Sequence, residues 1–298
     1  MIFTLTGNLL WERTFTFADW APGRTQRATG ETVQVGGKGI NVSKMLTRLG
    51  VLNTALCFAG GGTGAACAAW LEARGVAFRS FAADRPTRAG LVIRGGAQPE
   101  TVFLGPDAPP GPAAVRACAA FLEAQRDGST LAICGSLPGW ETGDSDPLRA
   151  ALENWFRRGT VVADTYGPPL AWLADRPLAL AKINRTEFDG LFPPAGSRGD
   201  LPARLQRARA GRPVRAWVVT DGPGPLCLAD EKGEAATLTP PAVREISATG
   251  SGDVLLACLL QSFAGGVLPL REAVAQALPY AAANAAHPGI AEFRLPAK

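Results

Sequence analysis

The chain has 298 residues, of which 47% are hydrophobic and 19% charged; this composition fits one large folded domain and excludes global disorder. Its 30 basic and 26 acidic residues leave a net charge of +4 without a basic tract, so we expect no nucleic-acid partner. A single histidine, His287, argues against a histidine-based metal site or a Ser-His-Asp triad.

Three features indicate a cytoplasmic protein with no membrane partner. The segment Met1 to Thr6 has neither a basic start nor a continuous apolar region, so we expect no secretion signal. The longest apolar run, Val254 to Leu260, is much shorter than the about 20 residues that span a bilayer. The six cysteines form no C-x-x-C pair, which fits buried and reduced thiols.

The first 110 residues contain short β-type runs that are divided by turns. We expect these runs to form a small sheet, inserted around the first strand and helix of the fold. The predicted strands are Phe15–Phe17, Glu31–Val35, Gly90–Arg94 and Thr101–Leu104. A helix is predicted after Asn41, because apolar residues recur from Val42 to Leu49 at helical spacing.

Beyond about residue 110, predicted strands alternate with amphipathic helices. The predicted helices start after Pro112, at Asp146 as N-cap (ending at Gly159) and at Leu201 (ending at Ala210). The predicted strands are 131–134, 161–164, 178–182 and 217–220. This alternation is typical of an α/β fold with a parallel sheet covered by helices on both faces. Ligands of such sheets bind beyond the carboxyl ends of the strands, where Ser136, Asn184 and Gly222 lie.

The strongest local motif is Ser247-Ala-Thr-Gly-Ser-Gly-Asp253, which leads directly into an apolar run. Unpaired N–H groups at a helix N-terminus, together with the helix dipole, attract a phosphate. Asp253 in the first turn is suited to accept a proton from an attacking hydroxyl while the amides stabilise the transferred group. The structural alternative is that Asp253 only complements the dipole and the glycines only form a turn.

Three further features fit either chemistry or local structure. The run Gly36-Gly-Lys-Gly-Ile-Asn41 either lets a ligand approach the backbone closely or only forms a glycine turn into a helix. It does not have the spacing of a Walker A sequence. Asn184 and Glu187 have the spacing of a capping box, or lie near phosphates and a hydrated Mg²⁺. Arg88 suits bidentate capture of a phosphate, or is a solvated surface group.

Together these motifs resemble the pfkB (ribokinase-like) carbohydrate kinases, and within them the phosphosugar branch that contains 1-phosphofructokinase and tagatose-6-phosphate kinase. Gly36–Val42 looks like the first family signature and Gly250–Asp253 like the second. Gly135–Gly139, Lys182–Glu187 and Ala283–Gly289 follow in the expected order, and the resemblance runs from residue 2 to about 293. It implies one kinase domain over residues 1–298, with a three-layer α/β/α fold, a mostly parallel central sheet and a small β lid from about 11–35 and 86–105.

The resemblance also implies an activity and a set of site residues. The activity is transfer of the γ-phosphoryl group of MgATP to a hydroxyl of a small sugar phosphate, by a homodimer formed through the lid. Asp253 matches the catalytic base, and Gly250, Ser251 and Gly252 match the anion hole. The expected acceptor site consists of Glu12, Gly36, Gly37, Lys38, Asn41, Arg88 and Ser136. The expected nucleotide site consists of Lys182, Asn184, Glu187, Thr220, Gly222 and Asn284, with Mg²⁺ held by Asn184 and Glu187 through water.

The chain departs from the family pattern at both substrate sites. Glu12 stands where the family commonly has the aspartate of Asn-Pro-Ala-x-Asp, and it is one methylene longer, next to the bulky Trp11. Gly90 stands where the family has an asparagine. Pro225 stands where the second glycine of the nucleotide loop is expected, and proline removes an N–H donor.

These departures leave two alternative functions. The first is a kinase for an unphosphorylated sugar or a nucleoside; Lys38 and Arg88 argue against it, because without an acceptor phosphate their charges would have no anion to meet. The second is a non-catalytic homologue that binds a sugar phosphate or a nucleotide. The intact Gly250–Asp253 motif argues against this second alternative.

Overall fold

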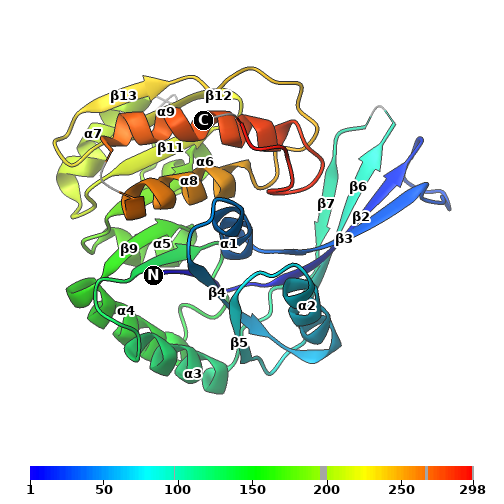
Figure 1. Cartoon of the computed structure of the whole chain (residues 1–298), viewed down its shortest axis with the longest axis horizontal. Helices are drawn as coiled ribbons and strands as arrows, with labels where there is room; N and C mark the ends of the chain where they lie inside the picture. The colour runs from blue at the N-terminus through cyan, green and yellow to red at the C-terminus, as the bar shows by residue number, and fades with distance from the viewer. Residues whose placement is uncertain (97, 195–199, 266–267, 297–298) are drawn as a thin grey trace.

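A nine-stranded, mostly parallel sheet lies at the centre of the molecule (Figure 1). The computed structural model describes residues 1–96, 98–194, 200–265 and 268–296. The strands of this sheet are, in spatial order, β13 (Ala235–Leu238), β12 (Gly224–Ala229), β11 (Trp217–Asp221), β10 (Leu180–Asn184), β9 (Thr160–Asp164), β8 (Thr130–Cys134), β1 (Ile2–Thr6), β4 (Asn53–Ala59) and β5 (Phe78–Ala82). All neighbours are parallel except β12 and β13, which extend the sheet antiparallel at one edge.

Helices cover both faces of this sheet. One face carries α3 (Pro112–Glu123), α4 (Asp146–Arg158), α5 (Gly167–Ala174), α6 (Arg185–Leu191) and α7 (Leu201–Gly211). The other carries α1 (Lys38–Arg48), α2 (Gly61–Ala73), α8 (Ser251–Gly265) and α9 (Leu270–Ala285). In β8, Leu131 and Ile133 pack into the first layer, whereas Ala132 and Cys134 pack into the second. This alternation confirms the predicted three-layer α/β/α fold.

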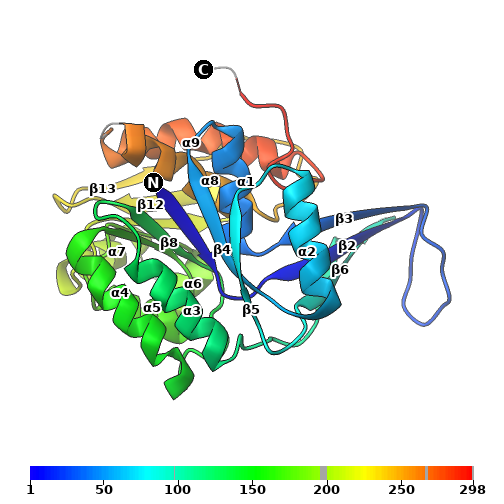
Figure 2. The ribbon, with the colours of Figure 1, turned by 60° about the horizontal axis from the view of Figure 1, so that its bottom comes forward.

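A smaller four-stranded sheet projects from the side of the body (Figure 2). Its order is β3 (Gly30–Gly36), β2 (Leu10–Phe17), β6 (Arg88–Gly95) and β7 (Thr101–Leu104). Glu12 pairs with Gly90 in the β2–β6 ladder, so Glu12 shares one face of the sheet with Arg88 and Arg94. Arg94 contacts the body through the carbonyl of Pro288, at 2.8 Å. We call this four-stranded sheet the lid.

Several predicted boundaries were wrong: α1 starts at Lys38 rather than after Asn41, and β2 starts at Leu10 rather than Phe15. Two others have a clear local cause. Helix α4 has Ser145 as N-cap rather than Asp146, because a 3₁₀ turn over Gly143–Ser145 runs directly into it. Strand β10 starts at Leu180 rather than Leu178, because the chain bends sharply there: the N–H of Leu178 donates to the carbonyl of Arg176, at 2.7 Å.

Within the described residues, no helix is both long and apolar enough to cross a membrane. All six cysteines are free and buried. Their burial agrees with the sequence-based expectation of reduced thiols in apolar surroundings.

Candidate active site

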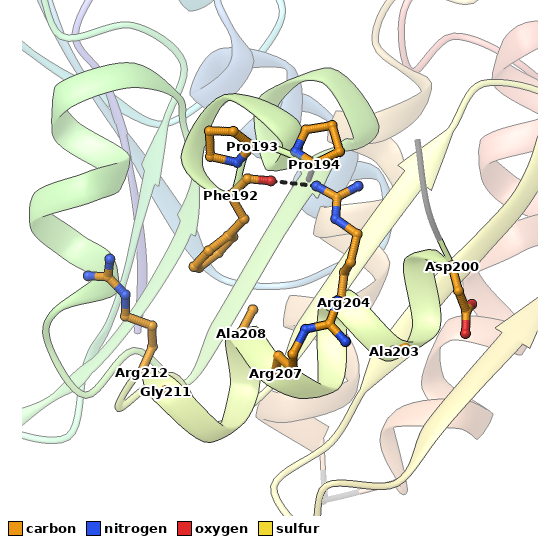
Figure 3. A pocket seen from close by; sticks show the side chains of 10 residues that line it. All are labelled: Phe192, Pro193, Pro194, Asp200, Ala203, Arg204, Arg207, Ala208, Gly211 and Arg212. Atoms are coloured by element: carbon orange, nitrogen blue, oxygen red, sulfur yellow. Dashed lines mark hydrogen bonds between the residues drawn. The ribbon is translucent and has the colours of Figure 1, made fainter. Parts of the chain in front are cut away.

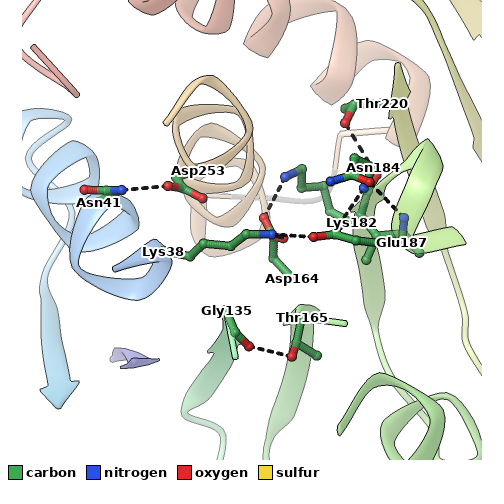
Figure 4. Close-up of polar contacts among 11 residues, drawn as sticks. Lys38, Asn41, Gly135, Asp164, Thr165, Lys182, Asn184, Glu187, Thr220 and Asp253 are labelled. Atoms are coloured by element: carbon green, nitrogen blue, oxygen red, sulfur yellow. Dashed lines mark hydrogen bonds and ion pairs between the residues drawn. The ribbon is translucent and has the colours of Figure 1, made fainter. Parts of the chain in front are cut away.

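Part of the predicted site lies together at the carboxyl edge of the large sheet, as expected for a parallel sheet (Figure 4). This part consists of Lys38, Asn41, Lys182, Asn184, Glu187, Thr220 and Asp253, whereas Glu12 and Arg88 lie on the lid. The first turn of α8 lies there beside the N-terminus of α1 and the ends of β9 and β10. Gly36 ends β3, and Gly37 is the N-cap of α1, so the glycine run carries the chain from the lid into the body.

The turn into α8 requires glycine. Gly250 has a φ of +80°, and a Cβ at this position would lie 2.3 Å from Cγ2 of Ile290. A Cβ at Gly252 would lie 2.5 Å from Nζ of Lys182, so the ammonium group of that lysine sits directly against the turn. Backbone N–H groups at the helix start and a neighbouring ammonium together form a site that attracts an anion.

Asp253 lies in the first turn of α8 and pairs with Asn41 of α1. Nδ2 of Asn41 donates to Oδ2 of Asp253 at 2.8 Å, and both side chains are 5% exposed. Burial and the nearby carboxylate of Asp164 raise the pKa of Asp253 to about 6. Oδ1 of Asn41 is buried without a hydrogen-bond partner among the described residues. A hydroxyl beside this pair would therefore meet both a base and a free acceptor.

Asp164, at the end of β9, links two lysines, and the sequence analysis missed it. Its Oδ1 accepts from Lys38 at 2.7 Å and its Oδ2 from Lys182 at 2.6 Å. Although burial disfavours its charged form, the ammonium groups of Lys182 and Lys38 hold the pKa of Asp164 below its usual value. An acidic residue that ends an apolar strand at the ligand edge was the signal that could have found it.

Lys38 does not point at the lid. Its Nζ bridges Asp164 and Glu187, at 2.7 and 2.9 Å. Although burial opposes it, these two carboxylates raise the pKa of Lys38 above its usual value. Lys38 is therefore a fixed cation, and it connects the α1 side of the site with the start of α6.

Asn184 and Glu187 form the capping box that their spacing predicts. Oδ1 of Asn184 accepts from the N–H of Glu187, and Oε2 of Glu187 accepts from the N–H of Asn184, both at 2.8 Å. Thr220 of β11 is in register with Asn184, and Gly222 follows in the turn to β12. The structural explanation is thus confirmed, while Oε1 of Glu187 also faces Lys38.

Asn284 of α9 holds the α8 turn from behind. Its Nδ2 donates to the carbonyl of Thr249 at 3.0 Å and to Oγ of Ser251 at 3.1 Å. Its Oδ1 accepts from the N–H of Ala291 at 2.9 Å. A role of Asn284 in nucleotide binding stays a prediction, because its amide is engaged within the protein.

Arg88 and Ser136 lie around a shared polar cluster. Nη1 of Arg88 donates to Oδ1 of Asp107 at 3.0 Å, and Nδ2 of Asn8 donates to the same oxygen at 2.7 Å. Asn8 also donates to Oγ of Ser136 at 3.0 Å. A cavity of about 320 Å³ begins at Asp107 and Ser136 and extends along Tyr166. The sequence analysis did not identify Asn8 or Asp107.

Glu12 is held by Gln34, which Lys44 contacts in turn. Nε2 of Gln34 donates to Oε1 of Glu12, and Nζ of Lys44 donates to Oε1 of Gln34 at 3.5 Å. Glu12 is 5% exposed and Lys44 6%. Burial raises the pKa of Glu12 and lowers the pKa of Lys44 to about 8.

A larger cavity of about 440 Å³ lies elsewhere, beyond the far end of α6 (Figure 3). Its lining includes Phe192, Arg204 and Arg212, and none of the predicted site residues. Arg204 donates to the carbonyl of Phe192 and pairs with Asp189 at 2.8 Å. Its volume alone would make this cavity the candidate active site. The polar side chains that converge, however, lie at the other end of α6, around Asn184 and Glu187.

Comparison with known proteins identifies the family and the fold. Several curated 1-phosphofructokinases match most of the chain; that of Bacillus subtilis (strain 168) is 27% identical over 280 residues, covering 92% of this chain and 88% of the relative. Phosphofructokinase-2 from Escherichia coli has a TM-score of 0.87 at 23% identity, covering 98% of this chain and 94% of that one. Ribokinase from Thermotoga maritima has a TM-score of 0.71 at 17% identity, covering 97% of this chain and 94% of that one. The similarity to these two structures shows a ribokinase-like fold. The sequence profile of the pfkB family carbohydrate kinases matches residues 12–298, and the chain belongs to this family.

Proposed function

We propose that the protein transfers the γ-phosphoryl group of ATP to a hydroxyl of a ketose phosphate, as a 1-phosphofructokinase does. The observation that carries this proposal is the Asp253–Asn41 pair, buried beside the anion-attracting turn of α8. Asp253 takes the proton of the acceptor hydroxyl as the new oxygen–phosphorus bond forms. The N–H groups of Gly250 to Gly252 and the ammonium of Lys182 stabilise the negative charge on the transferred group.

On the acceptor side, the sugar lies between the lid and α1. Asn41 offers its free Oδ1 to a hydroxyl, and Glu12 offers a buried carboxylate from the lid. Gly36 and Gly37 let the sugar approach the backbone, and Arg88 with Ser136 holds the phosphate that the acceptor already carries. Lys38, placed between Asp164 and Glu187, belongs to the boundary between the acceptor and the nucleotide.

On the nucleotide side, Lys182, Thr220, Gly222 and Asn284 surround the phosphates and the base. The carboxylates of Glu187 and Asp164 already bind the ammonium of Lys38, so Mg²⁺ would reach Asn184 and Glu187 through bound water rather than by direct contact. Mg²⁺ prefers oxygen ligands and keeps several waters, which agrees with indirect binding at Asn184 and Glu187. When bound, Mg²⁺ would neutralise charge on the phosphates of ATP.

We also propose a cytoplasmic homodimer that pairs through the lids. Phe15, Leu91 and Phe103 share the face of the lid opposite Glu12, and Phe103 is 55% exposed. An apolar sheet face that projects from the body is suited to pair with a second copy. Sedimentation of the wild type beside a Phe103→Asp variant tests this, and a monomeric wild type contradicts it.

The activity is tested by ADP release from MgATP with a panel of acceptors: fructose 1-phosphate, fructose 6-phosphate, tagatose 6-phosphate, fructose, ribose and adenosine. We expect turnover of one ketose phosphate by the wild type and a loss of about 10²–10⁴-fold in Asp253→Asn. Glu272→Gln is the matched control, because Glu272 is an exposed acid in the first turn of α9. Equal activity of Asp253→Asn and Glu272→Gln would mean that Asp253 only complements the helix dipole.

Phosphorylation of an unphosphorylated sugar is the second candidate, and one observation removes the argument against it. Lys38 and Arg88 were expected to have no anion to meet without an acceptor phosphate, yet each pairs with a carboxylate of the protein itself. Their presence therefore no longer separates the two acceptor classes. Turnover of fructose, ribose or adenosine in the same panel, with none of the phosphates, would favour this candidate.

A further inference from the structure

The carboxylate of Asp107 lies where an anionic ligand of Arg88 would lie. Its Oδ1 receives two N–H donors from different parts of the chain, Arg88 of the lid and Asn8 of the segment after β1, at 3.0 and 2.7 Å. A guanidinium and an amide that converge on one oxygen are the kind of donors that bind a phosphate oxygen. Asp107 thus supplies from within the protein the charge that an acceptor phosphate would bring.

The carboxylate of Asp107 satisfies only some of the N–H donors of Arg88. It meets Arg88 through a single nitrogen, Nη1, whereas Nε of Arg88 is buried without a hydrogen-bond partner among the described residues. The planar guanidinium is built to bind two oxygens of one anion. A phosphate, with three terminal oxygens, can bind two parallel N–H groups of this guanidinium, which Oδ1 of Asp107 in its present position does not do.

The loop after β7 fixes the place of Asp107 but leaves its side chain free to move. The N–H of Gly105 donates to the carbonyl of Ala89 at 2.8 Å, and the carbonyl of Pro110 accepts from the N–H of Asp84 at 3.2 Å. Prolines 106, 109 and 110 restrict the backbone between these two anchors. The side chain itself is 60% exposed, against 13% for Arg88, so a rotamer change carries the carboxylate into solvent.

We infer that Asp107 holds the place of the acceptor's phosphate in the free enzyme and swings out when a sugar phosphate binds. This inference rests on the proposed function and deepens it, because it names the residue that sets the affinity for the phosphorylated acceptor. Two anions beside one guanidinium repel each other, so each molecule of acceptor has to displace the carboxylate. A sugar without a phosphate leaves Asp107 in place.

The kinetic test compares Asp107→Asn and Asp107→Ala with the wild type. We expect the KM for the ketose phosphate to fall by about three- to tenfold, more in Asp107→Ala, with kcat and the KM for ATP unchanged. Glu141→Gln is the matched control, since Glu141 lines the same cavity, is exposed and is not bonded to Arg88. In the Arg88→Met background the effect of Asp107→Ala should vanish. A KM that stays constant or rises in both Asp107 variants overturns the inference.

A binding measurement separates this inference from the proposed function. Calorimetric titration with inorganic phosphate needs no turnover, and it should give tighter binding to Asp107→Ala than to the wild type or to Glu141→Gln. If no ketose phosphate is turned over, the proposed function fails while this titration still tests Asp107. Equal or weaker phosphate binding by Asp107→Ala overturns the role of Asp107, whatever the acceptor is.

Discussion

The two sides of the site are built differently. On the phosphoryl-transfer side, Asp164, Lys182 and Asp253 come from the core elements β9, β10 and α8, and their side chains are between 0 and 5% exposed. On the acceptor side, Arg88 comes from the lid and Asp107 from an exposed loop. A buried charge that loses its partner lowers stability strongly, whereas an exposed charge can be replaced at little cost in stability. We therefore expect a change of charge to cost more stability on the phosphoryl-transfer side than at Arg88 or Asp107.

The largest effect is expected from removing the charge that balances the core side. Asp164→Asn leaves the ammonium groups of Lys38 and Lys182 without this carboxylate, and breaking a buried pair lowers the free energy of unfolding by about 3–5 kcal/mol. Asp175→Asn is the control, because Asp175 pairs with Arg212 at the surface and should contribute under about 1 kcal/mol. Urea unfolding at pH 7 measures both. Equal losses in the two variants would remove the contrast between core and surface.

The loss of activity on the acid side of the pH profile should belong to the core side. Asp253 accepts a proton only when it is ionised. Burial and the carboxylate of Asp164 raise its pKa to about 6, although two lysines and Asn41 lower it. We therefore expect kcat/KM to fall about tenfold for each pH unit below 6, with the same midpoint for every acceptor. Asn41→Ala should move the midpoint upward, because it removes a hydrogen bond to the charged form. A flat profile between pH 5 and 7 would contradict this assignment.

A smaller and more selective effect is expected on the acceptor side, at Lys44. Lys44→Met removes the ammonium that contacts Gln34, which in turn holds Glu12, and we expect the KM for the acceptor to rise about tenfold with the KM for ATP unchanged. Lys44→Arg keeps the charge and should restore most of the affinity.

The wild type offers an independent check on Lys44. Burial lowers its pKa to about 8, with Glu292, Glu12 and Asp253 favouring the charged form and Arg74 opposing it. The ammonium therefore loses its proton as the pH rises through 8, and the acceptor KM should rise there in the wild type but not in Lys44→Arg. A change in the KM for ATP instead would place Lys44 on the nucleotide side.

The same contrast separates what the sequence could predict from what it could not. The turn at Gly250–Asp253 and the capping box at Asn184 are local, because a few consecutive residues determine each. Asp107 meets Arg88 and Asn8 from 19 and 99 positions away, so no local pattern reveals the contact. Lys38 was assigned to the acceptor from its motif, but its partners Asp164 and Glu187 lie 126 and 149 positions away.

Part of the fold escaped sequence analysis for a related reason. Strands β4 and β5 and helix α2 belong to the large-sheet layers, but the first 110 residues indicated mainly a small sheet. Helix α2 is rich in glycine and alanine, and it buries only Gly64, Cys67 and Leu71, too few to produce a helical period. Its place is determined by packing against β4 and the lid, which a single sequence does not display.

The smallest effect is expected at Pro225, on the edge of the nucleotide side. The β11–β12 ladder shifts register between Val219 and Asp221, and the β13 pairing begins only at Leu226. Pro225 lies on β12 between Gly224, which pairs with Asp221, and Leu226, where pairing with β13 begins. Its missing N–H therefore breaks no hydrogen bond of either ladder. Pro225→Gly should therefore change the KM for ATP by less than about threefold and leave the acceptor KM unaltered. Steady-state kinetics with saturating acceptor measure this. A tenfold gain in ATP affinity would show instead that Pro225 impairs the nucleotide site. It would favour the non-catalytic alternative, which the intact Gly250–Asp253 motif otherwise opposes.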